Sequence, residues 1–228
     1  MTDERLYKIF DVASRMFINQ GYARTQMNQI AKAAGIAVGS MYHLFESKEA
    51  VYGFVIKCII SPEYIQSPLS LPINEKDFSG LEEEIQLVFI NNSNEFDKHK
   101  AEISTGYNFE NMISLAFDTI SKYARGCLIF EKNINVHEEF VEIYRQFRAS
   151  FYTSVSEYLE LFEKKGYVRK IEDLKLATRF IIESISWWTM DLPYNSFEVQ
   201  EDIPAESAKK VVIDALSHAY GFPSSSGI

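Results

Sequence analysis

The sequence has few of the residues that interrupt helices or cross-link chains: 6 prolines, 10 glycines and 2 cysteines in 228 residues. So little proline and glycine argues against a chain of short strands and turns. No apolar run approaches the roughly 20 residues that a membrane span needs, and no apolar signal segment follows the polar N-terminus. We therefore expect a soluble, cytoplasmic protein with no membrane partner.

The motifs of common enzyme and metal sites are also absent. Neither Cys58 nor Cys127 has a partner at metal-ligand spacing, and both lie among apolar residues. This favours reduced thiols in the core, with a redox switch as the alternative. The 4 histidines form no His-Glu-x-x-His pattern, and no phosphate-binding glycine loop occurs. The sequence thus predicts no enzyme, no cofactor and no metal.

The net charge of −9 is unevenly distributed. Residues 1–50 contain six basic and five acidic side chains, so they are nearly neutral, and the excess acid lies in the remainder of the chain. A nearly neutral N-terminal region can still meet DNA phosphates with a few well-placed cations. The acidity of the whole chain therefore does not exclude a DNA-binding function.

Apolar residues recur at three- and four-residue spacing along most of the chain, which predicts an all-α fold. A first helix is predicted to begin after Thr2 or Asp3 and to end at Gly21. A short second helix is predicted after Thr25 as its cap, and Gly35 breaks it.

A third helix is predicted at about residues 38–45, and Ser47 is expected to cap a fourth. Met41, Leu44 and Phe45 are expected to pack the third helix onto the first. Two short helices joined by a glycine turn have the geometry of a helix-turn-helix, whose second helix lies in the DNA major groove. The spacing alone is weakly specific, because any helical hairpin with such a turn would satisfy it.

The remainder of the chain is predicted to be helical around one irregular segment. Three prolines between residues 62 and 72 predict an irregular connection. A polar stretch at 91–108 is expected to hold a short helix between loops. Longer helices are predicted at residues 109–130, 137–165, 174–192 and 204–220, followed by a disordered tail at 223–228.

Several residues of the N-terminal region occur together in a specific order. They are Gly21-Tyr22, Thr25, Ile30-Ala31-Lys32-Ala33-Ala34-Gly35, Gly39-x-x-Tyr42-x-x-Phe45 and Ser47-Lys48-Glu49. This combination closely resembles the DNA-binding domain of the TetR family of bacterial regulators, over about residues 5–57. The rest of the chain is similar only in being helical and of suitable length.

The resemblance implies a three-helix helix-turn-helix DNA-binding domain at residues 1–46 and a larger helical ligand-binding and dimerisation domain at 47–222. It implies phosphate contacts from Thr25, Tyr42 and Lys48. It also implies that the bases face Ala37, Val38, Gly39, Ser40 and His43.

The residues themselves support phosphate binding at two helix N-termini. Free N–H groups and the helix dipole at Thr25 and Ser47 favour an anion, to which Lys48 and Arg24 add positive charge. The plainer alternatives are that Thr25 and Ser47 are only caps, that Tyr42 is a core aromatic and that His43 is a surface histidine.

The third helix departs from the family pattern in one respect. It contains no lysine or arginine, and Val38 stands where many family members have a polar or basic residue. Bidentate recognition of guanine needs arginine or lysine, whereas apolar side chains suit the methyl group of thymine. We therefore predict an operator whose contacted core is rich in A·T pairs.

A DNA-binding domain this small (the DNA head) contacts few base pairs, so we expect a homodimer on a palindromic operator. The helices at 137–165 and 171–192 are the candidates for the interface, with Phe180, Trp187 and Met190 available for a partner. The alternative is that both apolar stripes face the core of one chain. The resemblance also implies a small-molecule effector. It is expected to be apolar or aromatic, and the candidate pocket residues are Tyr107, Met112, Phe151 and Trp187.

The sequence thus predicts a DNA-binding transcriptional regulator, expected to be a ligand-responsive repressor. The alternative function is a helical protein-binding adaptor whose DNA head has lost its function.

Overall fold

The computed structural model describes residues 3–198 and 202–221. It is helical in these ranges, with one isolated bridge between Phe45 and Ile73 and no strand. The all-α prediction is therefore confirmed. No helix within the described ranges is long and apolar enough to cross a membrane. The alternative cap Thr2 and the tail predicted at 223–228 lie outside the described residues.

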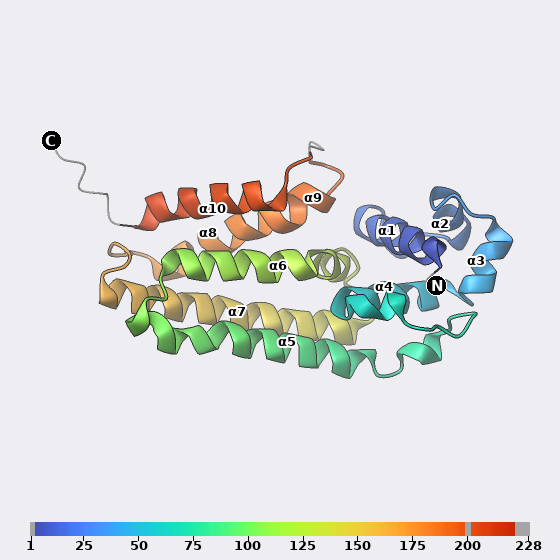
Figure 1. Ribbon diagram of the computed structural model, residues 1–228, viewed down its shortest axis with the longest axis horizontal. Helices are drawn as coiled ribbons and strands as arrows, with labels where there is room; N and C mark the ends of the chain where they lie inside the picture. The colour runs from blue at the N-terminus through green and yellow to red at the C-terminus, as the bar shows by residue number, and fades with distance from the viewer. Residues whose placement is uncertain (1–2, 199–201, 222–228) are drawn as a thin grey trace. The chain divides into compact units, whose positions relative to one another are not determined.

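The chain divides into two compact units, and Figure 1 labels the helices of both. Unit 1 comprises Met1–Val88 and Tyr123–Tyr144, and unit 2 comprises Phe89–Lys122 and Arg145–Ile228. This division by compactness differs from the domain boundary predicted at residue 46, which stays a prediction about the DNA-binding part.

Unit 1 begins with four helices: α1 (Glu4–Asn19), α2 (Met27–Ala33), α3 (Val38–Leu44) and α4 (Lys48–Ile60). Asp3 caps α1 by accepting a hydrogen bond from the N–H of Arg5 at 3.0 Å. Leu6, Ile9 and Phe17 then lie on one buried face, as a helical apolar stripe should. Gly21 ends the helix with φ of +82°, a backbone conformation that favours glycine.

The prediction that Thr25 caps α2 is wrong. The cap residue is Gln26, whose backbone N–H donates to the side chain of Gln29 at 2.9 Å. Thr25 is fully buried, and its hydroxyl donates to the carbonyl of Gly21 at 2.8 Å and accepts from Gln20 at 3.1 Å. The Thr25 hydroxyl, which the sequence pattern assigned to the cap of α2, therefore stabilises the turn that precedes this helix.

The predicted irregular connection follows α4 and contains two 3₁₀ turns, η1 (Pro62–Gln66) and η2 (Glu75–Phe78). Between them the chain forms a bridge to the end of α3. Ile73 accepts from the N–H of Glu46 at 2.9 Å and donates to the carbonyl of Leu44 at 2.8 Å. This bridge holds η2 next to the start of α4.

The remaining elements are α5 (Leu81–Lys98), η3 (His99–Thr105), α6 (Phe109–Lys132), α7 (Glu138–Lys165), α8 (Leu174–Ser186), the π turn η4 (Trp187–Asp191), α9 (Leu192–Tyr194) and α10 (Ala205–Tyr220). The prediction of loops around a short helix at 91–108 is wrong for its first half, because α5 continues to Lys98. Phe96 is only 2% exposed and anchors this part of the helix, so the polar residues before it form a solvent face.

The core of unit 2 is formed by side chains of α6, α7, α8 and α10. Tyr158 and Phe162 of α7 are fully buried there, as the apolar stripe predicted. The Tyr158 hydroxyl donates to the carbonyl of Phe96 at 2.5 Å, which ties α7 to α5. Cys58 and Cys127 are buried and form no disulfide bond, as predicted, and burial raises the pKa of the Cys58 thiol to about 12.

Candidate nucleic-acid interface

Helix α3 has one buried and one exposed side. Met41 and Leu44 are fully buried, together with Phe45 at its end, so the predicted burial of these residues is confirmed, and their packing against α1 stays a prediction. On the opposite side Tyr42 is 53% exposed and Val38 45% exposed, next to an exposed His43. Tyr42 is therefore a surface aromatic rather than a core one.

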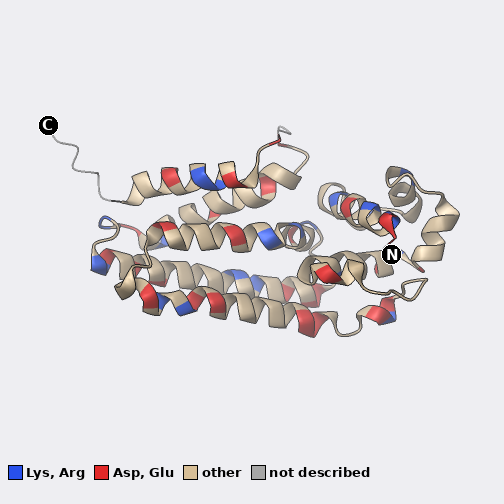
Figure 2. Cartoon of the chain, in the orientation of Figure 1, with Lys and Arg blue, Asp and Glu red and all other residues tan. Residues whose placement is uncertain are grey.

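The exposed side of α3 is uncharged (Figure 2). Ala37, Val38, Gly39 and His43 are exposed and Ser40 is half-buried, so the five predicted base contacts share this surface. A Cβ atom added at Gly39 would meet nothing within 4 Å, so packing within the protein does not require glycine there. A bare backbone at this position would allow close approach to a ligand outside the chain.

Ser47 caps α4, as predicted, by accepting from the N–H of Ala50 at 3.0 Å. The same hydroxyl donates to a carboxylate oxygen of Glu75 at 3.1 Å. A negative charge thus lies at the helix end where a phosphate was predicted. Sequence reasoning missed Glu75 because it lies 28 residues further along the chain, in the irregular connection.

Lys48, the first residue of α4, is held by Tyr22. Its Nζ donates to the Tyr22 carbonyl at 2.9 Å and lies 4.0 Å from the centre of the Tyr22 ring. Because an ammonium group has three donors, two remain for a phosphate. A hydrogen bond from the Tyr22 hydroxyl lowers the pKa of Glu49, and burial, reinforced by Glu49, raises the pKa of Tyr22.

Arg24 and Thr25 differ in their availability to DNA. Arg24 is exposed, and its Nε donates to the Gln20 carbonyl at the end of α1 at 2.7 Å. Thr25 is buried with its hydroxyl occupied, so a phosphate contact from that hydroxyl would need a rearrangement of the turn. Its role in DNA binding stays a prediction.

The four predicted effector residues differ in their surroundings, although Tyr107 packs against the core that contains Met112 and Phe151. Met112 and Phe151 are part of the unit 2 core, and Trp187 is 41% exposed. Tyr107 lines a shallow, mostly polar pocket formed by His99, Glu102, Thr105, Gly106, Tyr107, Asn111, Ser114, Leu115 and Asp118.

Within this pocket the Tyr107 ring stacks on the His99 ring, with centroids 4.8 Å apart and planes 4° apart. Nδ1 of His99 lies 2.6 Å from Glu102. Burial raises the pKa of Tyr107 to about 12. The pocket therefore combines one stacked aromatic pair with polar residues.

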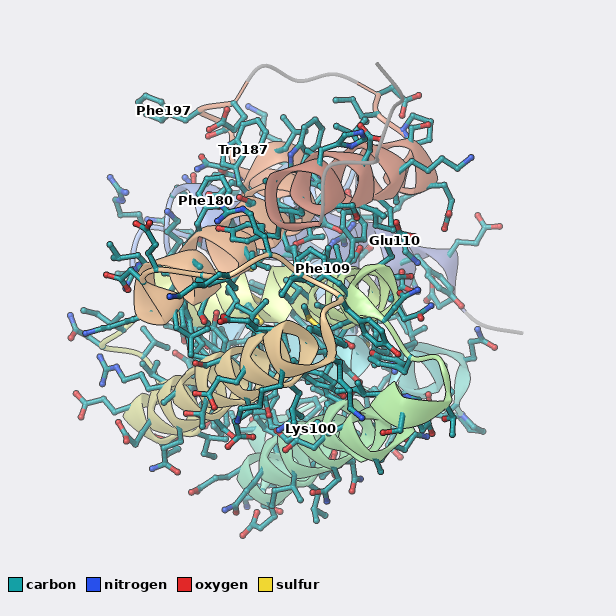
Figure 3. The ribbon with its side chains drawn as sticks, turned by 90° about the vertical axis from the view of Figure 1, so that its left-hand side faces the viewer. Lys100, Phe109, Glu110, Phe180, Trp187 and Phe197 are labelled. Atoms are coloured by element: carbon teal, nitrogen blue, oxygen red, sulfur yellow. The ribbon has the colours of Figure 1, made fainter. Side chains whose placement is uncertain are left out.

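Of the three residues predicted to face a partner, two are exposed. Phe180 is 57% exposed and Trp187 41% exposed, and Figure 3 shows both along the outer side of α8 and η4. Met190 is only 4% exposed, so its prediction as a contact residue is wrong. It lies in the π turn, which changes the helical register after Ser186 and directs Met190 inward.

Comparisons with known proteins place this geometry among regulators. Residues 9–53 match the family model described as "Bacterial regulatory proteins, tetR family". The chain is 32% identical over 72 residues to the "Biofilm operon icaADBC HTH-type negative transcriptional regulator IcaR" of Staphylococcus aureus (strain Newman), a match that covers 32% of this chain and 38% of that relative. It is 23% identical over 223 residues to the "HTH-type transcriptional repressor KstR2" of Rhodococcus jostii (strain RHA1), covering 93% of this chain and 91% of the relative.

The fold is similar to that of the ketosteroid transcriptional regulator KstR2 of Mycobacterium tuberculosis, with a TM-score of 0.58, 16% identity and 98% of each chain covered. At that identity the similarity concerns the fold alone. The relatives named by these comparisons are transcriptional regulators and not enzymes. All ten residues predicted to contact DNA lie within residues 9–53.

Proposed function

Because the chain belongs to the TetR family of bacterial regulatory proteins, we propose that it is a ligand-responsive transcriptional repressor that binds a palindromic operator as a homodimer. The observation that supports this most is the two-sided construction of α3. Its apolar residues Met41 and Leu44 are buried while Val38, Tyr42 and His43 are exposed without an obvious role in packing. The adaptor alternative has no comparable observation in its favour.

In the proposed complex α3 lies in the major groove and the N-terminus of α4 faces the DNA backbone. Phosphates are bound by Tyr42, Ser47 and Lys48, with Arg24 and Thr25 as further candidates. The bases face Ala37, Val38, Gly39, Ser40 and His43. With no cation on α3, contacts to thymine methyl groups favour an A·T-rich core, and phosphate contacts supply much of the affinity.

The proposed dimer uses an exposed apolar surface of unit 2. On α8 and η4, Leu176 is 63%, Phe180 57% and Trp187 41% exposed, and Val211 of the adjacent α10 is 52% exposed. Large apolar side chains gathered on neighbouring helices favour burial against a partner. A second copy related by a two-fold axis would place two recognition helices about 34 Å apart, one turn of DNA.

The effector is proposed to bind in unit 2. The His99–Tyr107 pair is the aromatic surface on which a flat apolar or aromatic molecule would stack. Glu102 and Asp118 in the pocket favour an effector that also has hydrogen-bond donors.

The DNA part of the proposal is tested by selection of duplexes from a random pool, followed by anisotropy titrations over a range of salt. Enrichment of palindromes with A·T-rich core positions is expected. A G·C core at the α3 positions would contradict the base contacts, and enrichment of no sequence would support the adaptor.

Lys48→Ala and Tyr42→Phe should weaken binding to all duplexes alike, and Lys48→Ala should also reduce the salt dependence because it removes a cation. Lys165→Ala, at the end of α7, is the matched control. The dimer is tested separately by sedimentation of Phe180→Glu. A dimer of unchanged stability would exclude α8 as the interface.

A further inference from the structure

Asn133, the first residue after α6, is buried in unit 1 at 6% exposure. Its Oδ1 accepts from the backbone N–H of Tyr22 at 2.6 Å. Its Nδ2 donates to the carbonyls of Phe17 at 3.0 Å and Ile129 at 2.7 Å. The amide therefore cross-links the end of α6 to a turn that lies 111 residues earlier in the chain.

The turn after α1 is shaped to receive this amide. The Phe17 carbonyl belongs to the last turn of α1, close to the helix end where carbonyls lack partners within the helix. Gly21, with its positive φ, then redirects the chain so that the N–H of Tyr22 points to Asn133. A Cβ atom on Gly21 would lie 3.5 Å from Oδ1 of Asn133, which shows how closely the two segments approach.

Tyr22 connects Asn133 to Lys48 through its own backbone. Its N–H donates to Asn133, and its carbonyl accepts from Nζ of Lys48 at 2.9 Å. The Tyr22 ring also lies under the Lys48 ammonium, 4.0 Å from centroid to Nζ. Because both backbone groups belong to one residue, a displacement of the N–H also displaces the carbonyl that holds Lys48.

The same connection between α6 and α7 supports the Tyr22 ring as well. His137, with φ of +50°, stacks on Tyr52 at a centroid distance of 5.1 Å. Tyr52 in turn meets the Tyr22 ring edge to face at 5.4 Å. Residues 133–137 thus constrain Tyr22 at two points, its backbone and its ring.

We propose that Asn133 is a positioning residue for DNA binding: it fixes Tyr22, and Tyr22 fixes the ammonium group of Lys48 for a DNA phosphate. This inference rests on the proposed function.

The test measures anisotropy titrations of the full-length protein with a selected duplex between 50 and 200 mM salt. The variants are Asn133→Ala, Lys48→Ala and the double variant. Ser14→Ala is the matched control, because it removes another buried hydrogen bond of unit 1, from Ser14 to the carbonyl of Phe10, without touching Tyr22. If circular dichroism shows that Asn133→Ala is unfolded, Asn133→Ser replaces it, since serine can still donate to the Ile129 carbonyl.

Asn133→Ala should lower the affinity roughly tenfold for each DNA-binding domain, because the Lys48 ammonium group would lose its hydrogen bond to a phosphate. The slope of log K against log salt should fall by about 0.9 per head, so that affinity declines about 3.5-fold less over this salt range. The double variant should bind within about twofold of Lys48→Ala, because both changes remove the same contact. Ser14→Ala should leave the slope unchanged.

If Asn133→Ala only destabilised unit 1 in general, its slope of log K against log salt would be unchanged, and the losses of affinity would add in the double variant. Either result would overturn the inference. An unchanged slope in Lys48→Ala would overturn it too, because Lys48 would then not bind a phosphate. Failure of the wild-type protein to bind any duplex would refute the proposed function itself, and the inference with it.

Discussion

Replacing Glu75 by glutamine should tighten DNA binding, although the residue lies outside the helix-turn-helix. The Glu75 carboxylate accepts a hydrogen bond from Ser47 at the N-terminus of α4, where the proposed complex has a phosphate. Glutamine can still accept this hydrogen bond but has no charge. The substitution therefore removes a repulsion and keeps the local geometry.

The size of the effect follows from one distance. Oε1 of Glu75 lies 3.1 Å from Oγ of Ser47. A phosphate bound by the free backbone N–H groups at the start of α4 would lie on the order of 6 Å from the carboxylate. At this separation two unit charges repel by about 0.7 kcal/mol in water, the appropriate medium for an exposed side chain. The affinity should rise about threefold for each head, or about tenfold for a dimer with two heads.

Fluorescence anisotropy with one selected duplex, from 50 mM to 1 M salt, provides the assay. The gain should be largest at low salt and disappear near 1 M, where the screening length is about 3 Å. Glu206→Gln, which removes a charge in the first turn of α10, controls for net charge. Unchanged or weaker binding by Glu75→Gln at low salt would refute a phosphate site at Ser47.

Three further predictions concern stability and reactivity. Gly53→Ala should lower the melting temperature, because its Cβ would overlap the Phe78 ring at a cost of about 1–3 kcal/mol. The double variant with Phe78→Ala should remove that clash. Additive losses of stability in the double variant would contradict the clash. Thr25→Val should lower the free energy of unfolding in urea by about 1–3 kcal/mol, since the Gly21 carbonyl loses its donor, whereas an unchanged value would leave only a DNA role for Thr25. Cys58, with its pKa raised to about 12 by burial, should react with a thiol reagent at pH 8 only after unfolding in guanidinium. Rapid reaction of the native thiol would refute this prediction. Because the unfolded thiol ionises near pH 9 and the folded one does not, the contribution of the buried thiol to the free energy of unfolding should be complete below pH 9 and lost as the pH rises to about 12.

The sequence by itself determined the features that depend on neighbours within one or two helical turns. Met41 and Leu44 are buried because their three-residue spacing puts them on one side of a helix. Ser47 caps α4 because its hydroxyl reaches an N–H three residues ahead. Gly21 ends α1 because glycine adopts positive φ at little cost. Each of these follows from local geometry, which the order of residues specifies.

Helix α5 marks the limit of such local reasoning. The polar run at 91–94 resembles a loop when judged by composition, and burial of Phe96 decides that it is the solvent face of a helix. Thr25 is a similar case, because both its own turn and the following helix could use its hydroxyl.

Only the tertiary structure decided what surrounds Lys48 and Ser47. Glu75 reaches Ser47 because the bridge between Phe45 and Ile73 holds η2 beside α4. Asn133 reaches Tyr22 across 111 residues because α6 ends against the turn after α1. These contacts depend on packing between distant segments, for which neither helical periodicity nor capping rules contain information. The sequence therefore identifies the helix-turn-helix, and the packing around it determines how its charges are held.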